Sequence, residues 1–329
     1  MIDDPESAAG SRQAGLSAAT VARWVEVHRL AVAGQEPDMA RSVGGRVARV
    51  WLRWSRFGDV AALANATLAL GPDAGALYDL GWAQTATGEP RKALVSYEHA
   101  LRLFHEAADR QGEAVTLNNI GNVYKHLGER QRALTYYQQA LPIIRAVGDR
   151  AAEAAALANI GNVEDDMRAL GYFEQALAIQ REIGDRGGEA ATLNSIGHGY
   201  DVLGHQPQAL TYYLNALPIR REVGDRAGEA ITLNNIGHVH KGLGDQPQAL
   251  TYYLGSLAIM CEIGDRTGEA VTRFNIAMLH RDEGNLDLAI AEMEIVVELD
   301  RQVEHPDLAS DTAVLERMRE TRAEAREAT

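Results

Sequence analysis

The stretch "GEAVTLNNIGNVYKHLG" (residues 112–128) recurs almost unchanged as "GEAITLNNIGHVHKGLG" (residues 228–244). A shorter marker, Gly-Asp-Arg with one Ala-Asp-Arg variant, shows the same repetition along more of the chain. Its aspartates stand at positions 109, 149, 185, 225 and 265, so the steps are 40, 36, 40 and 40 residues. Self-similarity at a fixed period in this range indicates a solenoid or another repeat array.

Each repeat contains two helical patterns. After Asp225, Leu233 and Ile236 recur at helical spacing, and Gly244 ends the pattern. A second apolar stripe follows at Leu250, Tyr253, Leu254 and Leu257. Gly224 can end the preceding helix in a left-handed conformation, and Asp225 can cap the next one. No stretch alternates with a period of two, so we expect helix–turn–helix throughout and no sheet.

Small residues stand at matching places in the two helices of each repeat. Glycine inside a helix costs about 1 kcal/mol relative to alanine, which is tolerable where another helix crosses closely. Such glycines occupy the first helices at Gly121, Gly161, Gly197 and Gly237, and the second helices carry Ala133, Ala169, Ala209 and Ala249.

"IGNVY" (residues 120–124), followed by Ala133, Tyr137 and Ala140, resembles the tetratricopeptide repeat (TPR). The usual leucine before the glycine is isoleucine here, and the usual period of 34 is about 40. In this respect the chain is similar to kinesin light chains, to Leu-Gly-Asn repeat adaptors and to bacterial peptide-responsive regulators. The resemblance extends over residues 76–300 and implies an all-α, right-handed TPR superhelical solenoid of antiparallel helix pairs.

We therefore predict four parts. Residues 1–16 are expected to be disordered, and residues 17–74 to form N-terminal cap helices with a degenerate repeat. Residues 75–300 are the TPR array, and residues 301–329 form a capping helix, which an open-ended solenoid requires. One repeat, around "NVEDDMRALGYF" (residues 162–173), is four residues short. This is either a tolerated deletion of about one helical turn or a kink that exposes Glu164, Asp165 and Asp166.

Composition limits the kinds of partner and the cellular location that we expect. The net charge of −14 argues against a nucleic-acid partner, since phosphate binding requires clustered Lys and Arg. The single cysteine, Cys261, excludes an internal disulfide framework and fits a reducing cytoplasm. No signal pattern or membrane-spanning apolar run is present, so we expect a cytoplasmic protein without a membrane partner. Seven arginines between residues 23 and 56, among three tryptophans, form either a solvated face or a docking face for an acidic domain or nucleic acid.

The TPR resemblance also implies which residues face a concave groove. They are the positions one, two and five after Leu117 and their equivalents in other repeats. The polar members are Asn118, Asn119, Asn122, Asn159, Asn162, Asn194, His198, Asn234, Asn235, His238 and Asn275. At the two ends the same positions carry the candidate apolar anchors Tyr78, Trp82, Phe274 and Met278.

The asparagines need an explanation because asparagine is a mediocre helix former. An amide both donates and accepts hydrogen bonds, so it can pair with the backbone of an extended peptide whatever the peptide's side chains. Alternatively, the amides join one repeat to the next, and both roles are compatible. At about 0.5–1.5 kcal/mol net per hydrogen bond, the amides alone would bind too weakly, so a ligand should also bury an apolar anchor.

No catalytic motif is present. The P-loop, dinucleotide-binding and nucleophile-elbow patterns are all missing. His238 and His240 are two residues apart on a helix and point to different faces, so we expect no metal site. His240 and His280 stand where the TPR pattern has tyrosine, which favours packing. Cys261 is interpreted as a core residue rather than a nucleophile. We predict no cofactor and no enzymatic activity.

The sequence thus predicts a non-enzymatic scaffold or adaptor that binds a protein or an extended peptide in its groove, with self-association left open. The alternative is the peptide- or partner-sensing arm of a bacterial signalling regulator, either of the STAND NTPase class or peptide-responsive. Because the chain lacks a P-loop, the nucleotide-binding part of a STAND regulator would have to be a separate portion.

Overall fold

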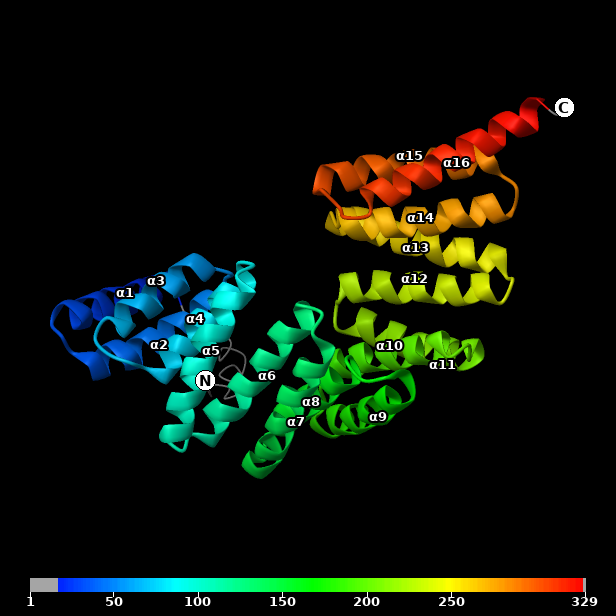
Figure 1. Cartoon of the computed structure of the whole chain (residues 1–329). Helices are drawn as coiled ribbons and strands as arrows, with labels where there is room; N and C mark the ends of the chain where they lie inside the picture. The colour runs from blue at the N-terminus through cyan, green and yellow to red at the C-terminus, as the bar shows by residue number, and fades with distance from the viewer. Residues whose placement is uncertain (1–16, 328–329) are drawn as a thin grey trace, which may run out of the picture. The chain divides into compact units, whose positions relative to one another are not determined.

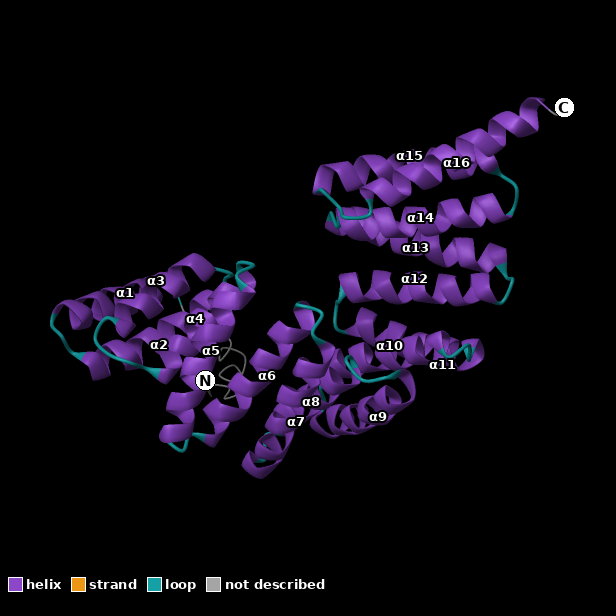
Figure 2. Cartoon of the chain, viewed as in Figure 1, coloured by secondary structure: helices purple, strands orange, loops and turns teal. Residues whose placement is uncertain are grey.

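The computed structural model describes residues 17–327, and every regular element in that range is a helix (Figure 2). The predicted disordered segment, residues 1–16, lies outside the described residues. Helix contacts divide the chain into two compact units at Ala152/Glu153, and each unit is considered separately. The expectation of an all-α array of antiparallel helix pairs is confirmed within each unit.

Consecutive helices are joined by short turns. The first unit contains α1 (Ala18–Ala33), α2 (Pro37–Arg53), α3 (Phe57–Leu68), α4 (Ala74–Ala86), α5 (Pro90–Glu106), α6 (Arg110–His126) and α7 (Arg130–Val147). The division falls within the first turn of helix α8 (Arg150–Gly161). The second unit continues with α9 (Asp166–Ile183), α10 (Arg186–Val202), α11 (Gln206–Glu222), α12 (Arg226–Gly242), α13 (Gln246–Ile263), α14 (Arg266–Asp282), α15 (Leu286–Val303) and α16 (Leu308–Glu327). Figure 1 shows α12 to α15 as successive layers.

The Gly-Asp-Arg triplet forms the turn between repeats. Gly224 has φ +71°, in the left-handed region, and the Asp225 carboxylate accepts a 2.8 Å hydrogen bond from the Gly228 backbone N–H. Asp109, Asp185 and Asp265 cap α6, α10 and α14 in the same way. The triplet therefore ends one helix and begins the next, as predicted.

The glutamate four residues after each capping aspartate is buried between arginines. Glu229 accepts from Arg221 Nε at 2.7 Å and from Arg226 Nη1 at 2.6 Å. Arg226 also reaches Glu262 in the following helix. These arginines lower the pKa of Glu229 against the effect of its burial, which is the largest single influence and raises it. Glu189 repeats the arrangement with Arg181 and Arg186, whereas both arginines that pair with Glu269, Arg266 and Arg273, lie on its own helix.

The mid-helix glycines lie against buried aromatic rings. A Cβ added to Gly237 would lie 2.7 Å from the Tyr253 ring, and one added to Gly121 would lie 2.5 Å from the Tyr137 ring. Both tyrosines are fully buried. In α14 the glycine is replaced by Ala277, and the residue facing it in α15 is Met293 instead of tyrosine. Where alanine replaces the smaller glycine, the facing residue is thus methionine, whose side chain is more flexible than that of tyrosine.

The four-residue deletion shortens an inner helix. Helix α8 has 12 residues, whereas α6, α10, α12 and α14 each have 17. About one helical turn is therefore lost from its C-terminal end. Asp165 is exposed and Glu164 is half-buried, but the side chain of Asp166 lies outside the described part, so the structure does not define an acidic notch there.

At the C-terminal end, α16 packs on α15, and Leu315 and Met318 enter the last hydrophobic cluster. Of the predicted capping segment, residues 301–329, the first three residues belong to α15, and the separate helix begins at Leu308. Among the described residues, no helix combines the length and hydropathy that crossing a membrane requires.

Candidate functional site

In the second unit, the predicted groove asparagines are hydrogen-bonded to one another across repeats. Asn235 Nδ2 in α12 donates to Asn194 Oδ1 in α10 at 3.3 Å, and Thr232 Oγ1 donates to the same oxygen at 3.3 Å. One repeat later, Asn275 Nδ2 in α14 donates to Asn234 Oδ1 at 3.0 Å. The amide two residues after the repeat leucine therefore bonds to the residue one after the leucine in the preceding repeat.

The first unit continues this rule with a tyrosine as acceptor. Asn119 Nδ2 in α6 donates to the Tyr78 hydroxyl in α4 at 2.8 Å. Burial raises the pKa of Tyr78, which therefore stays neutral at physiological pH. Asn122 accepts a 2.8 Å hydrogen bond from the Tyr137 hydroxyl. The inter-repeat role that the sequence left open is thus present in both units.

The amide ties are interrupted at the short repeat. At the position of Asn194 and Asn234, α8 carries Ala158, which has no side-chain acceptor, and the donor position in α10 is Ser195. Asn118 and Asn159 are half-buried and also engaged in polar or electrostatic interactions. Asn162 lies beyond the end of α8 and is exposed.

The imidazoles lie on the solvent side of the same helices. His198 and His238 are exposed, and His238 Nδ1 lies 3.0 Å from Asp201 Oδ2 of the preceding inner helix. His240 stacks on Tyr252 with ring centroids 5.3 Å apart, as Tyr200 stacks on Tyr212 one repeat earlier. His240 thus occupies the packing position of the tyrosine it replaces.

Two exposed aliphatic residues that the sequence analysis did not single out lie on this face. Ile231 is 49% exposed and Val271 is 48% exposed, three residues before Asn234 and Phe274. Residues three apart on a helix share a face, so Ile231 lies beside the amides of α12. That spacing could have identified them from sequence. We call Ala191, Asn194, His198, Ile231, Asn234, Asn235, His238, Val271 and Asn275 the inner face of the second unit.

The four candidate anchors differ in their accessibility. Trp82 is exposed on α4, and Tyr78 is half-buried with its hydroxyl accepting from Asn119. Phe274 is half-buried and packs against the last hydrophobic cluster. Met278 is 8% exposed and belongs to that cluster, so it supports the core and is closed to a ligand in this structure.

The amides of the inner face keep unused bonding positions. An asparagine side chain offers two donor hydrogens and two acceptor lone pairs. The tie between repeats uses one hydrogen of Asn235, while Asn194 Oδ1 accepts from both Asn235 and Thr232 and the Asn194 Nδ2 hydrogens are not part of the tie. Both residues are only half-buried. The remaining positions can therefore bond to a ligand without breaking the ties.

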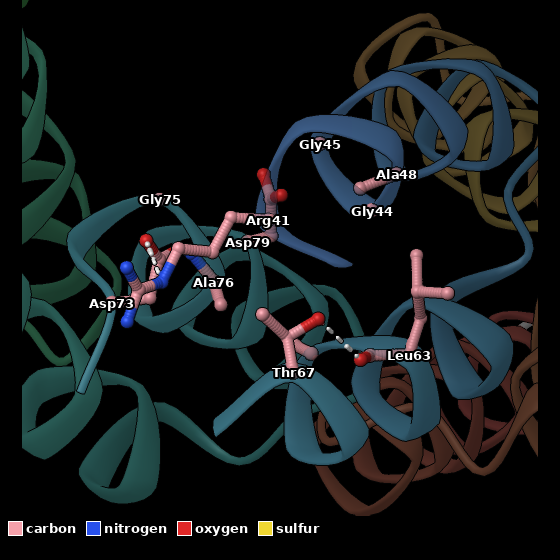
Figure 3. A pocket seen from close by; sticks show the side chains of 11 residues that line it. Arg41, Gly44, Gly45, Ala48, Leu63, Thr67, Asp73, Gly75, Ala76 and Asp79 are labelled. Atoms are coloured by element: carbon pink, nitrogen blue, oxygen red, sulfur yellow. Dashed lines mark hydrogen bonds and ion pairs between the residues drawn. The ribbon is translucent and has the colours of Figure 1, made fainter. Parts of the chain in front are cut away.

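A small cavity of about 40 Å³ lies between α2, α3 and α4 in the first unit (Figure 3). Arg41 reaches Asp73 there at 3.5 Å. Asp79, which occupies the position of the tying asparagines, lines the cavity, and burial raises its pKa to about 7, with Arg49 opposing and Asp73 adding. The volume holds a few water molecules and is too small for a substrate.

The arginine-rich segment is partly neutralised by local contacts. Arg29 pairs with Glu26, and Arg56 pairs with Asp59 while its guanidinium lies 4.7 Å from the Trp51 ring. Trp51 is buried in the first hydrophobic cluster, whereas Trp54 is exposed. These contacts are typical of the solvated face that the sequence analysis considered beside a docking face.

Within the described residues, no group of three or more His, Cys, Asp or Glu side chains has a metal-binding arrangement. Cys261, interpreted from sequence as a core residue, is instead exposed near the end of α13, because the core positions there are taken by Ile259 and Met260. Desolvation by the surrounding atoms, although only partial, is the main cause that raises the pKa of this thiol, and the nearby Glu269 adds to it. The raised pKa leaves Cys261 a poor nucleophile.

The geometry defines a class of protein, an all-α repeat array of antiparallel helix pairs with polar inner helices. Sequence models of the tetratricopeptide repeat match residues 112–168, 206–262 and 270–303. The chain therefore contains tetratricopeptide repeats, as the glycine–alanine pattern indicated. No protein among the curated sequences matches it.

Solved structures share the fold. BtubC (BKLC) from P. vanneervenii is 21% identical over 75% of this chain and 90% of its own, with a TM-score of 0.54. A STAND protein with a tetratricopeptide repeat sensor from Pyrococcus horikoshii is 16% identical over 92% of this chain and 54% of its own, with a TM-score of 0.65. A Rap protein complexed with competence and sporulation factor is 17% identical over 92% of this chain and 98% of its own, with a TM-score of 0.57.

Proposed function

We propose that this chain is a non-enzymatic scaffold that binds an extended peptide along the inner face of its second unit. The observation that supports this most is the combination of half-buried amides with spare bonding positions and two exposed aliphatic side chains, Ile231 and Val271, on the same helices. The amides suit a peptide backbone, and the aliphatic side chains supply the apolar contact that hydrogen bonds alone lack.

The TPR arrangement supports the same proposal, because inner helices of stacked TPRs line the concave side of the array. We also propose that the protein acts in the cytoplasm, where the exposed Cys261 would stay reduced. A second candidate is the partner-sensing arm of a bacterial signalling regulator. It is favoured by the fold shared with a STAND protein's TPR sensor and with a Rap protein solved with a bound factor.

The test is a selection of peptides from a random displayed library on the native protein. The selected peptides are then measured against the double variant Ile231→Ser/Val271→Ser. The matched control is Leu254→Ser, since Leu254 is equally exposed but lies on the outer helix α13. Binding that the inner-face variant loses and the control keeps supports the proposal. Equal binding to all three proteins, or loss in the control alone, contradicts it.

A further inference from the structure

At the C-terminal end of the inner face, a second cavity of about 140 Å³ lies where α14, α15 and α16 meet. One wall is apolar and comes from α14: Thr267, Ala270, Val271 and Phe274. The other wall carries Asp300 at the end of α15, His305 and Asp307 in the turn, and Asp311 in α16. The volume is several times what one water molecule requires.

Asp300 is an unusual residue for this position. It is 2% exposed, and its Oδ2 has no hydrogen-bond partner among the described residues. A buried carboxylate oxygen without a donor carries a desolvation cost, which a protonated Asp311 offsets in part through its hydrogen bond to Asp300. The equivalent positions one and two repeats earlier are Met260 and Arg220, so the helical repeat does not demand an acid here.

The other polar residues of the wall that carries Asp300 are two further carboxyls and one imidazole. The Asp307 backbone N–H donates to His305 Nδ1 at 3.3 Å, and the same nitrogen lies 3.9 Å from Asp300 Oδ1 and 3.8 Å from Asp307 Oδ2. Burial is the main cause that raises the pKa of Asp311 to about 6. A hydrogen bond with Asp300 and the charges of Asp300 and Asp307 add to it, while His305 lowers it. No lysine or arginine is among the residues that line the cavity.

The occupant is therefore expected to be a cation with an apolar stem. A guanidinium fits better than an ammonium for two reasons. Its fork of donors can reach both the Asp300 and Asp311 carboxyls, and its planar face can stack on the Phe274 ring. The described Asp and His side chains lack the arrangement that a metal ion would need.

Val271 connects this cavity to the inner face. Its side chain is about half exposed beside the amides and also lines the cavity. A peptide lying along α10, α12 and α14 would thus pass the cavity mouth. We propose that this acidic cavity receives an arginine side chain of the peptide that the inner face binds. The statement that the arginine belongs to a peptide rests on the proposed function, whereas the guanidinium site itself does not.

The experiment titrates the protein with a capped arginine, N-acetyl-arginine methylamide, and with its citrulline counterpart, which has the same shape but no charge. NMR chemical shifts report binding. The native protein should bind arginine about tenfold or more tightly than citrulline, as expected for charge-assisted hydrogen bonds. Equal binding of the two probes would overturn the proposal.

Asp300→Asn, which preserves the side-chain volume, should weaken arginine binding about tenfold. Glu298→Gln is the matched control, because it removes one charge from the same helix at an exposed site. Circular dichroism verifies folding, and Asp311→Asn replaces Asp300→Asn if the latter unfolds. Arginine binding that is unchanged in the folded cavity variant, or equally reduced in the control, rejects the site.

A further experiment with peptides distinguishes the arginine site from the proposed peptide-binding function. Library-selected peptides are remade with each arginine replaced by citrulline. Peptides that bind the inner face but tolerate citrulline overturn the arginine site and leave the peptide-binding function intact. Capped arginine that binds the cavity while no selected peptide needs the inner face leaves the guanidinium site intact and removes the peptide as its source.

Discussion

At the scale of single residues, the asparagines have a structural role before any ligand is considered. Each tying amide is held by a hydrogen bond to the preceding repeat, and Asn194 accepts two such bonds, from Asn235 and Thr232. Their side chains are thereby fixed in orientation. A fixed amide loses less conformational entropy when it binds a ligand, so the tie also prepares the inner face for recognition.

Asn194→Ala is therefore expected to destabilise the second unit by about 1 kcal/mol, because it leaves the half-buried Asn235 amide without its acceptor. The Thr232 hydroxyl, in contrast, still donates to the Gly228 carbonyl. His198→Ala, one turn further along the same helix at an exposed position, should change stability by less than about 0.5 kcal/mol. Urea unfolding followed by circular dichroism measures both. If the two variants unfold at the same urea concentration, the amide tie contributes nothing.

Asp79 leads to a prediction about pH. Burial raises its pKa in the folded protein to about 7, well above the value of about 3.9 that is usual for an aspartate side chain. Such a carboxyl favours folding fully only below its unfolded pKa, and this contribution disappears as the pH rises through about 7. Asp79→Asn supplies the uncharged amide found in other repeats. It should raise stability at pH 8 by roughly 1–3 kcal/mol and have little effect near pH 4.

Thermal unfolding of the native protein and Asp79→Asn at both pH values checks this. Asp38→Asn, at an exposed carboxylate in the same unit, is the control and should show no such pH-dependent gain. A gain in Asp79→Asn that is the same at pH 8 and pH 4 would mean that the charge of Asp79 is not its cause.

At the scale of the helices, each repeat is specified by a turn and by a close crossing. The Gly-Asp-Arg triplet ends one helix and caps the next, and Glu229 after one such triplet is held by arginines from both helices. The glycine in the inner helix then lets the buried tyrosine of the outer helix approach. Ala277 with Met293 shows that the two positions change together.

Two glycine substitutions separate crossing geometry from helix propensity. Gly237→Ala should destabilise by about 1–3 kcal/mol, because the added methyl meets the fully buried Tyr253 ring. Gly255→Ala, inside α13, meets only Leu233 Cδ1 at 3.6 Å and should stabilise by up to about 1 kcal/mol. Chemical denaturation of the two variants should thus show opposite signs. Stabilisation by both would disprove the close-crossing explanation.

The fold could be predicted from the sequence because its causes are local and repeated. Period, turn triplets and the glycine–alanine pattern each depend on residues within one repeat. The hydrogen-bond partners of Asn235 and Asn275 could not be predicted in this way. Each partner lies 41 residues away in the sequence, and the contact depends on how neighbouring inner helices pack. The cavity around Asp300 was missed for another reason. It arises where the array ends and α16 replaces a regular repeat, so no repeat motif marks it.

At the scale of the whole molecule, the outer and inner helices of the array have different roles. The outer helices, with their buried tyrosines and alanines, hold the repeats together. The inner helices of the second unit present amides, aliphatic side chains and, at the end, an acidic cavity. The net charge of −14 favours a cationic ligand over an anionic one, in agreement with that cavity.

The central claim is that the inner-face amides recognise a peptide backbone. A scan of N-methylated analogues of one selected peptide tests it directly, because each methyl removes a backbone N–H and leaves the side chains unchanged. The affinity should fall about two- to tenfold at several non-anchor positions, since each lost hydrogen bond is worth about 0.5–1.5 kcal/mol. Alanine substitution at those same positions should be tolerated. N-methylated peptides that bind as tightly as the parent, while alanine substitutions abolish binding, would contradict the claim.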